Sequence, residues 1–141
     1  MTASRGRGEG LGGARPETLR GGELTGAVLG AAIQVHRVLG PGLLESAYQR
    51  CLEIELRARR ISYERQREVV IEYAGQQIGA AYRLDFLVGG QLVVEVKSVE
   101  ALHDVHRSQL LTYMRLGGFP VGLVLNFNEP ILKNGIMRMV L

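Results

Sequence analysis

The sequence predicts a single α/β domain with a mixed β-sheet flanked by helices. Apolar residues recur at helical spacing in three segments, and five other segments carry the apolar runs of β-strands, in the order ααβββαββ. Three consecutive strands followed by a helix before the fourth strand require a crossover, which makes part of the sheet parallel. With 141 residues, 46% of them hydrophobic, the chain can form one core.

Two helices are predicted first, with a turn between them. Apolar residues in 24–39 recur every three or four positions, and Gly40-Pro41-Gly42 then ends the helix because proline and glycine disfavour its continuation. A second helix is predicted over 43–60, with Glu45 in its first turn, where the helix dipole favours a carboxylate. The expected buried stripe of this second helix is Leu44, Ala47, Tyr48, Cys51, Ile54 and Ala58.

The predicted β-strands follow these helices and are separated by glycine-containing turns. Ala74-Gly75-Gln76 and Gly89-Gly90 divide the first three strands, and Gly117-Gly118 ends the helix before the fourth strand. The strands are expected at 69–73, 77–88, 92–98, 119–127 and 136–141, with the third helix at 104–116.

The N-terminal segment differs in composition from the rest of the chain. Residues 1–22 are rich in Gly and Arg and almost free of apolar residues, so they are predicted to form a disordered tail before a domain at 23–141. No run of 18 apolar residues and no apolar leader occurs, which predicts no membrane association and a cytoplasmic location. Cys51 is the only cysteine, which excludes an internal disulfide and a thiolate metal cluster.

The basic residues are almost all arginines. Of 17, only Lys97 and Lys133 are lysines. Because arginine binds phosphate in a bidentate manner, this composition suits a nucleic-acid partner, although GC-rich codon usage would produce the same bias. Several of these arginines form a basic edge in which Glu64 is the only acidic residue. This edge is expected to hold the phosphate backbone, and the alternative is an ordinary solvated surface. This edge comprises Arg57, Arg59, Arg60, Arg65 and Arg67.

Three charged residues interrupt the apolar strands. Residues two apart in a strand point to the same face, so Glu95 and Lys97 project together, and Asp85 of the preceding strand can join them. Buried charges are costly unless they are paired or bind a metal. Two converging carboxylates suit Mg²⁺ or Mn²⁺, with the lysine reaching the same site. A structural salt bridge is the alternative, but one lysine would leave one carboxylate unpaired.

The turn at Gly89-Gly90 decides whether these charges meet. A two-residue loop would place Asp85 opposite Val94, on the wrong face. A three-residue loop or a bulge would pair Asp85 with Glu95, and glycine supplies the left-handed residue that such a loop needs. We predict this second register.

These residues resemble a known family. Asp85, nine further residues and Glu95-Val96-Lys97 are similar to the core of the PD-(D/E)XK nuclease superfamily. The segment Gly42-Leu43-Leu44-Glu45-Ser46-Ala47-Tyr48 matches the motif of the GxxExxY group, and the resemblance covers residues 24–141. The proline of the superfamily name is absent, since Leu84 precedes Asp85, but that proline is not a ligand.

The resemblance implies a restriction-endonuclease-like fold and a set of site residues. Asp85 and Glu95 would bind the metal, Glu45 would complete the acidic set, and Lys97 would be the catalytic lysine. Gln109 and Tyr113 would match the Gln-Xaa-Xaa-Xaa-Tyr element of RecB-like nucleases. Their spacing of four residues places them on one helix face, although it equally suits a packed tyrosine and a surface glutamine.

The histidines give weaker indications. His103, Asp104 and His106 lie together, but a transition-metal site needs further ligands, so Asp104 is expected to cap a helix instead. His36, before the Gly40 turn, could flank the same cleft as Glu45 and contact phosphate.

The expected function is Mg²⁺- or Mn²⁺-dependent hydrolysis of phosphodiester bonds in nucleic acid, with DNA as the expected substrate. The alternative is a catalytically inactive module on the same fold that binds nucleic acid or protein. No separate recognition domain is expected in a chain of this length, so sequence specificity is expected to come from a homodimer, a partner protein or the structure of the nucleic acid.

Overall fold

The computed structural model describes residues 21–141 and omits the side chains of Ala80 and Ala81. The predicted tail therefore lies outside the described residues, except for its last two positions. Helix α1 spans Gly21–Leu39, so Gly21 and Gly22 belong to a helix that begins three residues before the predicted start. No helix in 21–141 is long and apolar enough to cross a membrane.

A five-stranded sheet forms the centre of the fold, and its strands lie in sequence order. The third and fourth strands are parallel, and every other neighbouring pair is antiparallel. The predicted mixed sheet and element order are thus confirmed, with a short 3-10 helix, η2 (Leu132–Gly135), added before the last strand. The strands are β1 (Tyr63–Tyr73), β2 (Gln76–Val88), β3 (Leu92–Lys97), β4 (Val121–Asn126) and β5 (Ile136–Val140).

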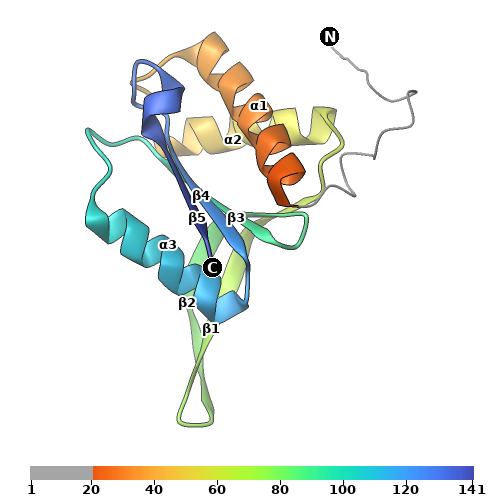
Figure 1. Ribbon diagram of the computed structural model, residues 1–141, viewed down its shortest axis with the longest axis vertical. Helices are drawn as coiled ribbons and strands as arrows, with labels where there is room; N and C mark the ends of the chain where they lie inside the picture. The colour runs from red at the N-terminus through yellow and green to blue at the C-terminus, as the bar shows by residue number, and fades with distance from the viewer. Residues whose placement is uncertain (1–20) are drawn as a thin grey trace.

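Strand β1 begins six residues earlier than predicted. Its first half is polar and carries no apolar run, so the sequence pattern gave no strand signal there. Pairing with β2 nevertheless extends from Tyr73 opposite Gln76 back to Tyr63 opposite Val88. The resulting hairpin is long, and its tip projects beyond the rest of the domain (Figure 1).

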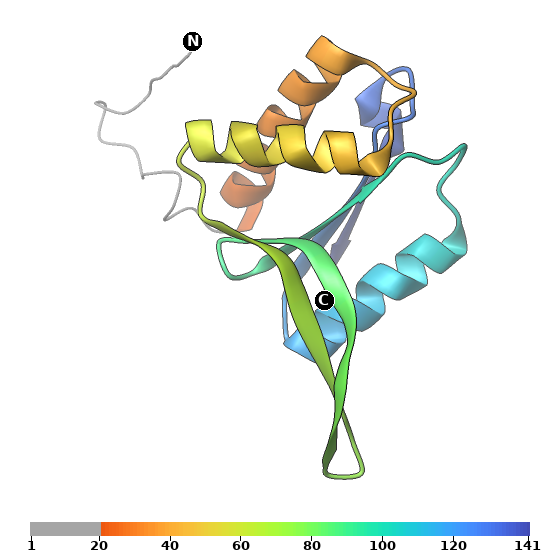
Figure 2. The ribbon, with the colours of Figure 1, turned by 180° about the vertical axis from the view of Figure 1, so that it is seen from behind.

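Helices cover both faces of the sheet. Helices α1 and α2 (Glu45–Ala58) lie on one face, and α3 (Asp104–Gly117) lies on the other (Figure 1, Figure 2). Strand β3 shows the alternation: Val94 and Val96 pack in the core under α1 and α2, whereas Val93 packs with α3.

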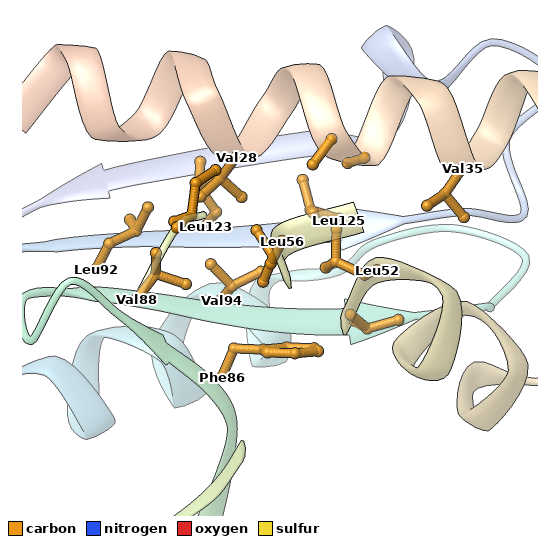
Figure 3. Packing of buried hydrophobic residues seen from close by; sticks show 14 of the residues in the cluster. Val28, Val35, Leu52, Leu56, Phe86, Val88, Leu92, Val94, Leu123 and Leu125 are labelled. Atoms are coloured by element: carbon orange, nitrogen blue, oxygen red, sulfur yellow. The ribbon is translucent and has the colours of Figure 1, made fainter. Parts of the chain in front are cut away.

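The larger core lies between the sheet and the pair α1–α2. Val28 and Val35 of α1, Leu52 and Leu56 of α2, and Phe86 of β2 meet there (Figure 3). The buried residues of α2 are Tyr48, Leu52 and Leu56, so the predicted stripe was wrong at Leu44, Ile54 and Ala58, which are exposed.

Candidate active site

The hairpin between β2 and β3 has the predicted register. Phe86 lies opposite Val94, and Val88 lies opposite Leu92, which leaves a three-residue loop. Gly89 and Gly90 of this loop both have positive φ, at 60° and 71°, a conformation that glycine adopts without strain. Continuing the same register places Asp85 opposite Glu95.

Glu95 lies on the face of the sheet that α3 covers, and Asp85 lies beside it. Leu87 and Val93, two residues away along each strand, both pack against α3. The predicted register is therefore confirmed, and hydrogen bonds join Asp85 to Glu95 and Val96 across the two strands.

Each carboxylate is fixed by the backbone of the opposite strand. The Asp85 N–H donates to Glu95 Oε2 over 2.9 Å, and the Val96 N–H donates to Asp85 Oδ2 over 2.8 Å. The regular backbone pairing of β2 and β3 ends at Phe86 and Val94, and these two bonds connect the strands beyond that point. Glu95 is only 7% exposed, so its position is determined by the sheet itself.

The pair is not neutralised by a salt bridge. Within residues 21–141, the ion pairs do not include Asp85, Glu95 or Lys97. Burial, with the Asp85 charge adding to it, raises the pKa of Glu95 to about 8, and Lys97 opposes this only in part. Burial also raises the pKa of Asp85, against the opposing effects of the Val96 N–H and Lys97. The arrangement disfavours two negative charges, which the structural salt-bridge alternative does not explain.

A divalent cation fits this donor set. One oxygen of each carboxylate has no hydrogen bond to residues 21–141, so Asp85 Oδ1 and Glu95 Oε1 remain for a ligand. No three His, Cys, Asp or Glu side chains of that segment are grouped closely enough to hold a metal by themselves. Mg²⁺ does not require such a group, because it commonly binds one or two carboxylates together with waters and substrate phosphates.

Glu45 holds the chain immediately after Lys97. The Ser98 N–H donates to Glu45 Oε2 over 3.2 Å, and the Ser98 hydroxyl donates to the Leu43 carbonyl over 2.6 Å. Glu45 is also near enough for its charge to raise the pKa of both carboxyls.

Tyr48 completes this connection within the Gly42–Tyr48 motif. Its hydroxyl donates to the Gly40 carbonyl and accepts from the Leu43 N–H. Its ring stacks on Phe127, with ring centroids 4.6 Å apart. The motif thus joins the start of α2 to the end of β3.

Asn126, which was not predicted from the sequence, holds the other side of the same segment. Its amide group accepts from the Val99 and Asn128 N–H groups and donates to the Val99 carbonyl. It is fully buried and lies opposite Lys97 in the parallel pair β3–β4. The signal in the sequence that could have identified Asn126 is a single asparagine at the end of an apolar strand.

We expect Asn126→Ala to destabilise the protein by about 2–3 kcal/mol, because it leaves the part-buried N–H groups of Val99 and Asn128 without their partner. Asn128→Ala is the matched control, since its side chain makes one 3.3 Å bond to the Val99 carbonyl, and it should cost less than about 1 kcal/mol. Denaturant unfolding measures both values, and equal losses would contradict this role for Asn126.

The structure brings Gln109 and Tyr113 to one hollow beside the carboxylates. This hollow has a volume of about 280 Å³ and is lined by Tyr82, Val105, Ser108, Gln109, Thr112 and Tyr113. Burial raises the pKa of Tyr113, and the neighbouring charge of Glu95 adds to it. Tyr82 was not singled out from the sequence, because its contact with Tyr113 joins two distant elements.

The histidines have structural contacts. His36 Nε2 lies 2.7 Å from the Glu129 carbonyl and lines a separate hollow that includes Arg37 and Lys133. The expectation that Asp104 caps α3 was wrong. His103 occupies the cap position, and its N–H donates to His106 Nδ1 over 2.9 Å.

The predicted basic edge is largely paired with carboxylates, so the expectation that only Glu64 opposes it was wrong. Arg57 and Arg65 both pair with Glu53, which lies one turn before Arg57 on α2. Two further pairs join Arg59 to Glu55 and Arg67 to Glu64. Arg60 makes no ion pair within residues 21–141.

Comparison with known proteins agrees with this geometry. Residues 22–139 match the family model of the PD-(D/E)XK nuclease superfamily. Neither the curated proteins nor the solved structures gave a match. The match extends over most of the chain and includes every residue of the site described above, and the sheet has the arrangement of a restriction-endonuclease-like fold. The chain therefore belongs to the PD-(D/E)XK nuclease superfamily.

Proposed function

We propose that this protein is a metal-dependent nuclease that hydrolyses phosphodiester bonds of DNA, and that it belongs to the GxxExxY group. The observation that carries the proposal is the pair Asp85 and Glu95. These carboxylates are held by backbone N–H groups, have no cationic partner within 21–141, and lie on the sheet of a nuclease-family chain.

In this proposal, Asp85 and Glu95 hold Mg²⁺ or Mn²⁺, and Glu45 contributes a third negative charge nearby. A bound divalent ion would lower the pKa of a coordinated water and offset charge on the phosphate. Both carboxylates are fixed before substrate binds, so little reorganisation is needed during the reaction.

Lys97 is the proposed catalytic lysine. It is the last residue of β3, two positions after Glu95, and therefore projects on the same face. Hydrogen bonds fix the peptide group that follows Lys97, because the Phe127 N–H donates to the Lys97 carbonyl and the Ser98 N–H donates to Glu45. The side chain can thus orient the attacking water and stabilise charge on the phosphate.

Gln109 and Tyr113 are proposed to position the substrate. They lie one helical turn apart on α3 and line the same hollow beside the carboxylates. Their polar groups can hydrogen-bond to the nucleotide next to the cleaved bond.

The test is a cleavage panel of plasmid, single-stranded and branched DNA with Mg²⁺ or with chelator. We expect cleavage only with the metal, and at least about a hundredfold loss in Lys97→Ala. Lys133→Ala is the matched control, because Lys133 is the chain's other lysine and is exposed on η2, and it should stay within about threefold of wild type.

Binding of DNA without cleavage by the wild type would instead favour the inactive module. Equal activity of Lys97→Ala and wild type would overturn the role of Lys97.

A further inference from the structure

Among residues 21–141, those that line the hollow beside the carboxylates carry no charge. Its walls are two tyrosine rings, the apolar Val105 and the neutral polar side chains of Ser108, Gln109 and Thr112. A phosphate would need cations or several backbone donors, which this lining does not show. An uncharged, planar group with hydrogen-bonding edges suits it better. The volume of about 280 Å³ is at the small end for ligand sites, which suits one ring system.

Tyr82 presents an aromatic surface at the edge of this hollow. It lies on β2 and is 44% exposed, although its ring contacts Tyr113 with centroids 5.5 Å apart and planes inclined at 48°. Tyr113 by contrast is only 6% exposed. Tyr82 therefore has ring surface left for a further stacking partner, while Tyr113 holds it in place.

Tyr113 also connects the hollow to the carboxylates. Tyr113 packs in one buried cluster with Val93 and Leu87, which are two residues from Glu95 and Asp85 along their strands. A nucleotide whose phosphate lies at Asp85 and Glu95 would thus have its base within reach of the hollow, since base and phosphate of one nucleotide are neighbours.

We propose that this hollow binds an unpaired nucleobase next to the cleaved bond, with Tyr82 as the stacking platform and Gln109 at the base edge. The inference rests on the proposed nuclease function and specifies its substrate as a single-stranded or locally unpaired nucleic acid. In a duplex the faces of each base are covered by its neighbours and the pairing edge is occupied, so neither is free for Tyr82 and Gln109.

The experiment measures binding of a fluorescent 12-nucleotide single-stranded DNA, its RNA equivalent and a blunt DNA duplex, in chelator so that no cleavage occurs. Stacking of one base on an aromatic side chain corresponds to a change in Kd of about 5- to 100-fold. We expect Tyr82→Ala to weaken binding of the single strand by that factor, and Tyr82→Phe to bind within about twofold of wild type, because it keeps the ring.

Tyr73→Ala is the matched control. Tyr73 lies on the same hairpin, beside its turn, is 74% exposed and does not line the hollow. It should leave binding of all three probes unchanged. Single strands that each lack one base should identify one position at which loss of the base weakens binding to the wild type. The same loss should have no further effect on binding to Tyr82→Ala.

The outcomes separate this inference from the proposed function. Metal-dependent cleavage by the wild type, with Tyr82→Ala binding the single strand as tightly as wild type, overturns the base site alone. Equal weakening of single strand and duplex by Tyr82→Ala also overturns it. Absence of both binding and cleavage in the wild type overturns the nuclease function and the base site together. The DNA and RNA probes show which sugar the site accepts.

Discussion

Glu95→Gln and Asp85→Asn should each lower metal-dependent cleavage by about a thousandfold or more. Each change keeps the size of the side chain but removes the negative charge that would hold the cation. Both side chains can still accept the backbone N–H bonds that Glu95 receives from Asp85 and Asp85 receives from Val96. The loss of cleavage would therefore reflect the missing negative charge and not a displacement of the strand. Initial rates of plasmid cleavage at saturating Mg²⁺ measure it.

Glu72→Gln is the control for these two variants. Glu72 is exposed near the far end of the β1–β2 hairpin, opposite Gln77, and should keep activity within about twofold of wild type. If Glu95→Gln cleaved at the rate of the control, the carboxylate pair could not be the catalytic centre.

The metal-free protein should lose stability as the pH rises from about 4.5 to 8. The folded pKa of Glu95 is raised to about 8 from an ordinary value of 4.5, mainly by burial. Between these values the unfolded chain has released the proton that the folded chain still holds, so the free energy of unfolding falls with rising pH. The expected loss is about 2–4 kcal/mol, which urea unfolding in chelator at several pH values would measure.

Glu95→Gln should remove the part of this dependence that comes from Glu95. A neutral amide carries no charge to bury, so we expect the variant to be about 2–3 kcal/mol more stable than the metal-free wild type at pH 8 and similar to it at pH 4.5. A structural salt bridge would give the opposite sign, since removing one partner of a buried pair destabilises a protein. A less stable Glu95→Gln protein at pH 8 would therefore contradict this description of the site.

The carboxylate pair could be predicted from the sequence because it depends on local rules. The alternation of strand residues fixes which side chains share a face, and the glycines at 89 and 90 permit the loop that sets the register. The order of elements followed from apolar periodicity in the same way. Positions of helices and strands with strong periodicity, such as α3 and β3, agreed within one residue of the prediction.

Features that depend on distant partners could not be predicted. The polar half of β1 is a strand because β2 pairs with it, and Arg65 is neutralised by Glu53 of α2. The role of Asn126 requires the segment after Lys97 to lie beside it, and Tyr82 becomes part of a hollow only when α3 packs on the sheet. The stripe of α2 was misplaced because Leu44 precedes the helix and the apolar Ile54 lies on its exposed side.

The most direct test of the metal site is a calorimetric titration with Mn²⁺. The experiment compares wild type, Glu95→Gln and the control Glu72→Gln at the same pH and ionic strength. If Asp85 and Glu95 form a divalent-cation site, wild type and control should bind the ion with the same affinity, and Glu95→Gln should show no measurable binding. A wild-type protein that does not bind Mn²⁺, or a Glu95→Gln protein that binds it as tightly as wild type, would contradict the proposed metal centre.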